Sequence, residues 1–443
     1  MTGAQSPAPA SPDLARTIGP VGLAALVINT IIGSSVFVFP AVVAAAMGSA
    51  GLLAYVVAGT AMALIVLCLA DSGSRVTAAG GAYAYVGAAF GPFAAWLVGI
   101  LLYLGAQVIA AAVVSSVFVK SLSVLVPQAG TGPARITVLI VIFLVFAFIN
   151  VRGGARLGTR VVESVTLAKL LPLLLLVGLG IAAFNPDFLR IEEMPSLPDL
   201  GRMAMRLLYL FAGAEAVLAV SGELRDPGRT VPRGALGGLA VATFIYLGVQ
   251  FAAQGILGPA LPAHDKAPLA DAAAAVLGAP GKTLLLLGTV ISTLGYLSAD
   301  MVASPRTLYA MGVAGRLPRA FASVHPRFGS PAVAIVVHAA AACSLAMIAD
   351  FDLLTSLSSS ALLLIYLLCC TATMVLQRRG VGAGTEGFRL RFGPLIPLAA
   401  TALVLGMMTT LARREIAAVL IVTVIAWVSY RATTKRRSDR LTV

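Results

Sequence analysis

The sequence predicts an all-α polytopic membrane protein with about twelve transmembrane helices. Three observations lead to this fold class. Hydrophobic residues make up 59% of the chain, charged residues only 11%, and the mean hydropathy is +0.97, so the chain is more apolar than a soluble domain. Apolar runs of roughly 20 residues, each long enough to cross about 30 Å of hydrocarbon, recur along the whole sequence. Two of these runs are interrupted near their middle by small and hydroxylated residues.

The spans follow one another with short loops between them. Their approximate centres are Ile32, Ala61, Leu104, Val141, Leu173, Gly213, Phe244, Ile291, Ala340, Leu364, Leu403 and Val422. The segment before the first span is rich in Ala, Pro and Ser and lacks a cationic start followed by a cleavable apolar core. We therefore expect a disordered tail there rather than a signal peptide. The predicted organisation is a cytoplasmic tail (1–16), a first repeat of five spans (17–185), a second repeat (186–378), two further spans (379–432) and a basic cytoplasmic tail (433–443).

The net charge of +13 arises mainly from Lys and Arg in short loops, where such residues orient a chain in the membrane. We therefore expect the lipid bilayer, and not nucleic acid, as the partner of this chain. An even number of spans places both termini on one side. About twenty Lys and Arg on that side, against about eight on the other, predict that both termini are cytoplasmic.

The first span, from Ile18 to Ala46, contains a break at mid-depth, where residues 31–37 read IIGSSVF. The sixth span contains a second break, where residues 210–215 read LFAGAE. Unwound backbone in hydrocarbon costs several kcal/mol per unpaired polar group. Such a segment therefore persists where it lines a cavity and its free amides and carbonyls meet a ligand.

Small residues in a membrane span also serve close helix packing, and for a single cluster this interpretation is favoured. Two clusters at corresponding positions favour a ligand site instead. If spans one to five repeat as spans six to ten in inverted orientation, the two breaks face each other near the bilayer midplane. The residues themselves show no clear repeat, so this symmetry is predicted from the span count and the matched breaks.

Three ionisable residues lie inside spans, where a charge costs roughly 2.5 kcal/mol or more and is normally tied to function or to a partner. Glu215 follows the second break and is predicted to cap the second half-helix, to gate the site, or both. Lys169 either tethers neighbouring helices or titrates during a transport cycle, because burial favours the neutral amine. Asp300 has three alternatives: pairing with Lys169, holding a cationic ligand group, or stabilising the eighth span.

Other classes of membrane protein find little support. The four cysteines fall within hydrophobic spans, so we expect buried thiols and no disulfide framework. The histidines His264, His325 and His338 are scattered, and no His-Glu-x-x-His motif occurs. We therefore predict no catalytic residues, no metal site and no cofactor. A membrane receptor remains the rival class, because it would bind the same ligand without moving it, although receptors more often carry a soluble output domain.

Four ordered motifs resemble those of the amino acid, polyamine and organocation transporter superfamily, in particular its bacterial amino acid permease and antiporter branch. The motifs are IGSSVF at 32–37 followed by Pro40, GGAYAY at 80–85 with FGP at 90–92, ELRDPGRTVPR at 223–233, and SPRTLYAM at 304–311 with GRLP at 315–318 and Pro331.

This resemblance implies the leucine-transporter-like fold, with five plus five inverted spans, broken helices 1 and 6 and two extra C-terminal helices. It implies a secondary active transporter that moves amino acids across the bacterial inner membrane by alternating access, with proton symport or amino acid exchange. A polyamine or organic-cation antiporter is the alternative. Protons are expected as a second small partner, and the protein is expected to be a monomer or a homodimer.

In this family the amides of the first break hold the substrate carboxylate, and carbonyls of the broken spans receive its ammonium group. Carried onto this chain, the implied substrate-binding residues are Thr30, Ile31, Gly33, Ser34, Ser35, Phe211, Ala212 and Gly213. Gating or coupling is assigned to Tyr209, Glu215, Lys169 and Asp300.

Lys169 matches a lysine that occupies the place of a sodium ion in sodium-independent relatives, so the resemblance implies that transport is not coupled to sodium. Ser35 stands where the family usually has glycine, and its Cβ restricts the backbone and narrows the pocket. Tyr209 and Ala212 occupy positions that help to set side-chain preference in relatives.

Overall fold

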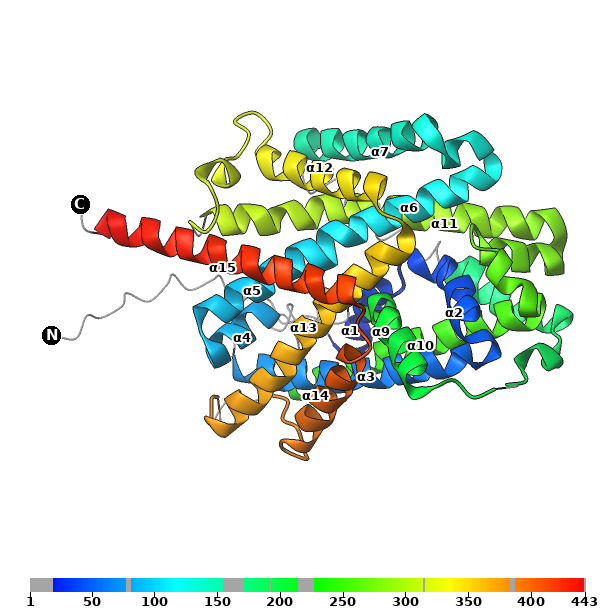
Figure 1. The fold of residues 1–443 in the computed structure, drawn as a ribbon, viewed down its shortest axis with the longest axis horizontal. Helices are drawn as coiled ribbons and strands as arrows, with labels where there is room; N and C mark the ends of the chain where they lie inside the picture. The colour runs from blue at the N-terminus through cyan, green and yellow to red at the C-terminus, as the bar shows by residue number, and fades with distance from the viewer. Residues whose placement is uncertain are drawn as a thin grey trace.

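The computed structural model describes residues 19–76, 81–153, 170–191, 193–213, 227–313, 315–382 and 387–441, and within these ranges it is helical and has no β-strand (Figure 1). The α-helices are α1 (Pro20–Ile31), α2 (Phe39–Met47), α3 (Gly51–Arg75), α4 (Ala82–Phe90), α5 (Pro92–Leu101), α6 (Ile109–Leu125), α7 (Gly132–Gly153), α9 (Leu197–Phe211), α10 (Pro227–Leu257), α11 (Pro268–Val313), α12 (Ala332–Ile348), α13 (Phe351–Arg378), α14 (Leu395–Met408) and α15 (Arg413–Leu441). A further apolar helix covers Leu170–Leu179.

The prediction of an all-α polytopic membrane fold is confirmed. Seven helical segments of the described residues are long and apolar enough to cross a membrane: Phe39–Arg75, Pro92–Leu125, Gly132–Arg152, Thr230–Ala263, Pro268–Val313, Phe351–Arg378 and Arg413–Ala432. Four shorter apolar helices are Pro20–Ile31, Leu170–Leu179, Ala332–Ile348 and Leu395–Met408. Each of the twelve predicted span centres falls on one of these helices or at a helix break.

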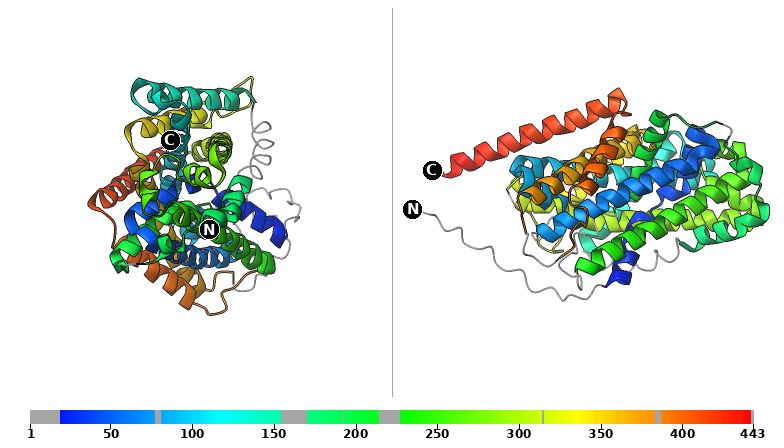
Figure 2. Two further views of the ribbon diagram at one scale, coloured as in Figure 1. Left: turned by 90° about the vertical axis from the view of Figure 1, so that its right-hand side faces the viewer. Right: turned by 90° about the horizontal axis from the view of Figure 1, so that it is seen from below.

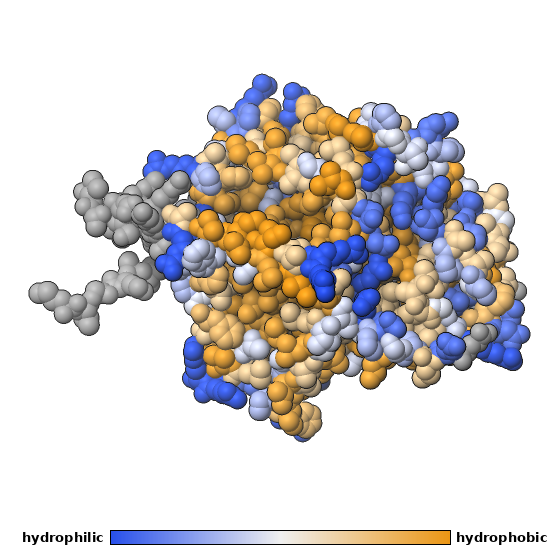
Figure 3. All heavy atoms as spheres, in the orientation of Figure 1, coloured by the Kyte–Doolittle hydropathy of each residue, from blue (hydrophilic) through white to orange (hydrophobic). Residues whose placement is uncertain are grey.

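The surface has the apolar character that a bilayer requires. Hydrophobic residues cover much of the face seen in Figure 3, and hydrophilic residues lie mainly around its edges and in a group near its centre. Large apolar side chains are exposed along α7, where Leu144 is 63% exposed, and along α15, where Ile421 is 60% exposed. Lipid tails satisfy such side chains, whereas water does not. Figure 2 shows α15 running along the outside of the bundle, and it continues as helix to Leu441, into the predicted basic tail.

The centre of the molecule is formed by helices that pack against several neighbours at once. Helix α13 contacts α3, α4, α6 and α9, and α10 contacts α1 and α3. The helices α7 and α12 lie side by side at one edge of the bundle (Figure 1). Small residues bring α1 close to α10, since a Cβ on Gly238 would lie 2.7 Å from the Ala24 carbonyl oxygen. This close approach is the packing role that glycines have in membrane helices, and it positions the end of α1.

Helix α11 has 46 residues, more than one crossing of a bilayer needs, and it contains a bend. Helix α11 changes direction at Gly278, whose φ of 65° and ψ of −153° are not helical. The residues after this bend form the long straight part of α11 that carries Tyr296 and Asp300 past the centre of the protein.

Candidate functional site

The first break has a defined local geometry. Helix α1 ends at Ile31, and Ile32 has φ −75° and ψ 86°, which is close to an inverse γ-turn. Accordingly, the Gly33 amide donates to the Ile31 carbonyl at 2.8 Å. A single 3-10 turn, Ser35–Phe37, follows, and Pro40 then occupies the first turn of α2. Among the described residues, the amides of Ser34, Ser35 and Val36 have no acceptor, as expected at the start of a helical segment.

The second break lies directly against the first. Helix α9 ends at Phe211, Ala212 has ψ 140°, and Gly213 has a left-handed φ of 107°. A Cβ on Gly213 would lie 2.6 Å from Cγ2 and 3.2 Å from the carbonyl oxygen of Thr30. Only glycine has both the backbone freedom and the lack of side chain that this contact requires.

Tyr246 of α10 ties the two breaks together. Its hydroxyl lies 2.7 Å from the Ile31 carbonyl oxygen and 3.0 Å from that of Leu210. These carbonyls belong to the last turns of α1 and α9, where helices leave acceptors without an intrahelical donor. Tyr246 was not predicted from the sequence, because a tyrosine in an apolar span carries no signal of its own.

A cavity of about 460 Å³ lies between the broken helices and α11. It is lined by Thr30, Ile31, Gly33, Ser34, Ser35, Val36, Gly81, Ala82, Leu102, Ala106, Gln107, Ala110, Val114, Tyr209, Leu210, Ala212, Gly213, Tyr246, Tyr296, Ala299, Asp300, Ala303, Ser304 and Ser358. The structure therefore brings together nine of the twelve residues predicted for the site.

The three others differ in position. Phe211 does not line the cavity, because its side chain is fully buried and its ring packs edge-on against Tyr246 at 5.4 Å. Lys169 and Glu215 lie outside the described residues. The predicted loop between spans two and three contributes Gly81 and Ala82 at the start of α4.

Two polar atoms in the lining have no hydrogen-bond partner among the described residues. They are the Ser34 hydroxyl and the Gln107 side-chain carbonyl. Buried polar atoms are nearly always satisfied, so an unpaired donor and an unpaired acceptor in one cavity indicate a ligand with complementary groups. Ser34 was predicted from sequence and Gln107 was not.

Gln107 belongs to a segment of π-helix, Leu102–Val108, between α5 and α6. A π-helical turn leaves carbonyls without their usual donors and is frequent at functional sites. The Ser358 hydroxyl of α13 donates to one of these carbonyls, that of Gly105, at 2.6 Å. The small residues Gly105 and Ala106 are the available sequence signal, because Gly105 approaches Ala361 closely.

Asp300 pairs with a residue that sequence reasoning left aside. Its Oδ2 lies 2.8 Å from Nε2 of His338 on α12, and the Ser304 hydroxyl donates to Oδ1 at 2.5 Å. The side chains of Asp300 and His338 are 5% and 0% exposed. The histidines are far apart in sequence, but His338 lies in the middle of an apolar span, where an ionisable residue normally has a partner.

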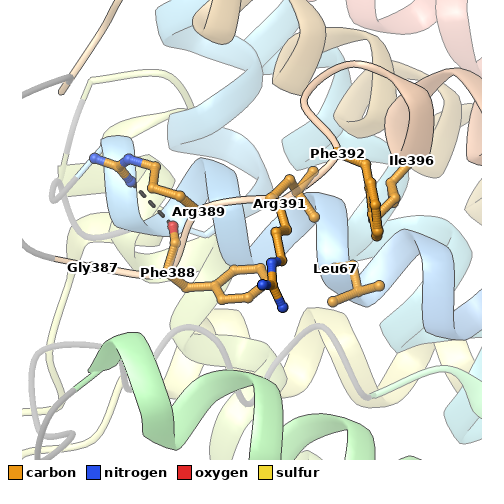
Figure 4. Close-up of a pocket in the computed structure, with 8 residues that line it drawn as sticks. Leu67, Gly387, Phe388, Arg389, Arg391, Phe392 and Ile396 are labelled. Atoms are coloured by element: carbon orange, nitrogen blue, oxygen red, sulfur yellow. Dashed lines mark hydrogen bonds between the residues drawn. The ribbon is translucent and has the colours of Figure 1, made fainter.

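A second cavity, of about 660 Å³, shares no lining residue with this site. It is lined by Leu67, Gly387, Phe388, Arg389, Leu390, Arg391, Phe392 and Ile396, and Figure 4 shows the side chains of the 387–392 segment around it. Among the described residues, no group of three or more His, Cys, Asp or Glu could hold a metal ion.

A buried carboxylate anchors the segment that forms this second cavity. Asp71 of α3 is fully buried and accepts from Arg75 at 2.8 Å, from the Gln377 side chain at 3.0 Å and from the Leu390 amide at 3.3 Å. Burial and the charge of Arg75 lower the pKa of Arg389, while Asp71 acts in the opposite direction. These contacts fasten α3, α13 and the segment before α14 to one another.

Comparison with known proteins identifies transporters along nearly the whole chain. A family model described as "Amino acid permease" matches residues 18–435. The chain is 28% identical over 402 residues to the "Serine/threonine exchanger SteT" of Bacillus subtilis (strain 168), which covers 88% of this chain and 89% of that protein. It is 26% identical over 424 residues to the "Methylthioribose transporter" of the same organism, covering 90% and 89%. It is 25% identical over 399 residues to the "Branched-chain amino acid permease BcaP" of Lactococcus lactis subsp. cremoris (strain MG1363), covering 84% of each chain.

Proposed function

Because this chain belongs to the amino acid permease family, we propose that it carries a neutral amino acid zwitterion across the cell membrane by alternating access, without sodium. The observation on which this proposal rests is the cavity between two broken helices that contains an unpaired donor, Ser34, and an unpaired acceptor, Gln107. The family and its relatives are transporters, so an enzymatic activity is not proposed.

The first break suits the carboxylate of the substrate. Free amides at the start of a helical segment carry partial positive charge and bind anions. Ser34 and Ser35 contribute two such amides, and the buried Ser34 hydroxyl adds a donor beside them. The Gly33 amide is already used by Ile31, so we assign the carboxylate to the two serines.

The ends of α1 and α9 suit the ammonium group, because helix C-termini carry partial negative charge. The Ile31 carbonyl accepts from both Gly33 and Tyr246, which occupies its two lone pairs. We therefore assign the ammonium to the main chain around Thr30 and Ala212, with the Gln107 carbonyl as a further acceptor. Tyr209, which stacks on Phe39 at 6.3 Å, is the proposed gate on the α9 side.

A neutral substrate is favoured over a polyamine by the charge of the cavity. Asp300 is the one charged residue among the described lining residues, and its carboxylate already bonds His338 and Ser304. A polyamine carries several positive charges, and each would need an acid or an equivalent acceptor in a site of low dielectric constant. A relative that exchanges serine and threonine and another described as a branched-chain amino acid permease support the same substrate class.

Several finer points belong to the same proposal. Lys169 resembles the amine that replaces sodium in relatives, which supports sodium-independent exchange or proton symport. The loop charges support cytoplasmic termini. The two facing breaks support a division into repeats over 17–185 and 186–378, followed by two further spans. A monomer or a homodimer is consistent with all of these features.

The test is flux of radiolabelled amino acids into proteoliposomes that contain the purified protein. We expect label to accumulate, competition by one class of neutral amino acids, and nearly the same rate after sodium is replaced by choline. Binding without flux would instead indicate a receptor, competition by polyamines alone would indicate the antiporter alternative, and a strong sodium requirement would contradict sodium independence.

A further inference from the structure

We propose that Asp300 and His338, termed here the Asp300–His338 pair, form the proton-binding site that couples this transporter to pH. This inference rests on the proposed function, because it gives the transport site its coupling ion. It differs from the sequence-based expectation, in which titration by Lys169 was one of two alternatives for that residue.

The pair connects the substrate cavity to a buried base. Asp300 on α11 lines the cavity, whereas His338 on α12 does not. Their Nε2–Oδ2 distance is 2.8 Å, and neither side chain is more than 5% exposed. His338 therefore acts on the cavity through Asp300 and does not touch the substrate.

The surroundings satisfy both protonation states of the imidazole. When His338 is neutral, Nε2–H donates to Asp300, and Nδ1 accepts from the Tyr103 hydroxyl, which lies 3.4 Å away. When His338 is protonated, Nδ1–H donates and the same hydroxyl accepts, because a phenol does both. Ser304 donates to the other carboxylate oxygen in either state. The pair thus keeps the same contacts to Tyr103 and Ser304 when its charge changes.

No fixed cation among the described residues neutralises the pair. The titratable groups that interact electrostatically with Asp300 are three phenols, Tyr103 of the π-helix, Tyr209 of α9 and Tyr296 of α11. Four cations on the helices packed against α12 have other partners. Lys120 of α6 lies over the Phe351 ring, Arg135 of α7 donates to carbonyls at the end of α12, Arg152 of α7 lies over the Phe148 ring, and Lys282 of α11 pairs with Asp271. Arg306 of α11 and Arg319 in the turn that follows are exposed.

The charge of the pair is therefore set by one proton. With a neutral imidazole the pair carries one negative charge, and with an imidazolium it carries none. A zwitterionic substrate adds no net charge to the cavity. The net charge of the cavity therefore depends on whether the pair has bound a proton. The added proton binds Nδ1, which contacts the Tyr103 hydroxyl: the hydroxyl passes its proton to Nδ1 and takes another from water, and the reverse transfers return a proton to water later in the cycle. No other reactant is needed.

The test compares pH profiles of His338→Gln and His264→Gln. His264 forms a pair of similar length with Asp271, 2.9 Å, but lies outside the cavity, so its replacement is the matched control. Radiolabelled serine and, in a second series, radiolabelled leucine are the probes. Between about pH 5 and 8, where imidazole changes charge, we expect wild-type and His264→Gln uptake to change at least about threefold. His338→Gln uptake should change less than about 1.5-fold over the same range.

A second measurement needs no substrate and so separates this inference from the proposed function. Infrared difference spectra of the purified protein between about pH 5 and 8 should contain one imidazole component that is missing from His338→Gln and present in His264→Gln, while the components of His264 and His325 remain in His338→Gln. A difference spectrum of His338→Gln identical to that of the wild type, a wild-type pH profile in that variant, or flattening of the profile by Lys169→Ala but not by His338→Gln would overturn the assignment. If the pair were only a structural salt bridge, His338→Gln would lower the amount of folded protein and leave the pH profile of uptake unchanged.

Discussion

The hydroxyl of Tyr246 lies 2.7 Å from the carbonyl oxygen of Ile31, at the point where the first membrane span stops being helical. The same hydroxyl lies 3.0 Å from the carbonyl of Leu210 in the last turn of α9. One side chain of α10 therefore holds the C-terminal ends of both α1 and α9. The breaks are held in place partly by a neighbouring helix, and not only by the residues that form them.

Tyr246→Phe should loosen both breaks, because it leaves two buried carbonyls without this donor. We expect a loss of about 1–3 kcal/mol of folding free energy and a larger relative loss of transport, measured by thermal unfolding in detergent and by uptake into proteoliposomes. Tyr55→Phe is the control, since Tyr55 is equally buried and bonds Gln250 instead of the breaks. Equal effects of the two substitutions would contradict the role of Tyr246 at the breaks.

Gly213→Ala should impair transport, because the added Cβ would both strain a left-handed residue and clash with Thr30. A non-glycine residue in a strained backbone region costs about 1–3 kcal/mol. The measurement is the uptake rate at saturating substrate, normalised to the amount of folded protein.

Gly237→Ala provides the comparison for this prediction. Gly237 lies within α10 and a Cβ there would meet nothing within 4 Å, so the substitution should preserve uptake and add slightly to helix stability. If both alanine variants transported like the wild type, the close contact between the breaks would not be needed for function.

Ser34→Ala should weaken substrate binding without affecting insertion. A hydrogen bond to a charged group contributes about 1.5–3 kcal/mol, so we expect KM to rise about tenfold or more when the hydroxyl that faces the carboxylate is removed. Ser34→Leu should abolish uptake, because its side chain would fill the carboxylate position.

Ser292→Ala is the matched control for Ser34. Its hydroxyl is also buried and without a partner among the described residues, but Ser292 does not line the cavity. KM should therefore stay within about twofold of the wild-type value. Normal uptake by Ser34→Leu would exclude the first break as the substrate site.

Asp71→Asn should destabilise the fold and leave substrate affinity unchanged. Removing one charge of a buried ion pair costs about 3–5 kcal/mol, because the other charge remains uncompensated, and the Arg75 side chain is only 11% exposed. Thermal unfolding in detergent measures the loss. Asp187→Asn should have no measurable effect, since its bond to Arg190 is between side chains that are 64% and 80% exposed.

The fold class and the position of the candidate site could be predicted because they depend on local sequence. Span length and hydropathy indicated twelve segments, and the run of small residues at 31–37 indicated a break whose residues do line the cavity. Among the predicted residues that the structure describes, Phe211 alone does not line the cavity. At the end of α9, Ala212 lines the cavity, whereas the side chain of the neighbouring Phe211 packs in the core.

The partners of these residues could not be predicted. Gln107, Tyr246 and His338 lie in spans remote from the breaks in sequence, and each is one of a few polar residues in an apolar helix. Hydropathy shows that such a residue is present but not which way it faces. Asp300 illustrates the difficulty, because three alternatives remained open until α12 was seen to bring His338 within 2.8 Å.

By itself, the sequence determined that this chain is a bundle of membrane helices and where two of those helices stop. The length of an apolar segment and the need to pair its backbone polar groups in lipid both depend on that segment alone. Its sequence is therefore enough to predict whether it spans the membrane. The tertiary structure alone decided which side chains complete the broken ends and which base lies behind the acid in the cavity. Such contacts join residues as much as 215 positions apart in the chain, and they exist only after the helices have packed.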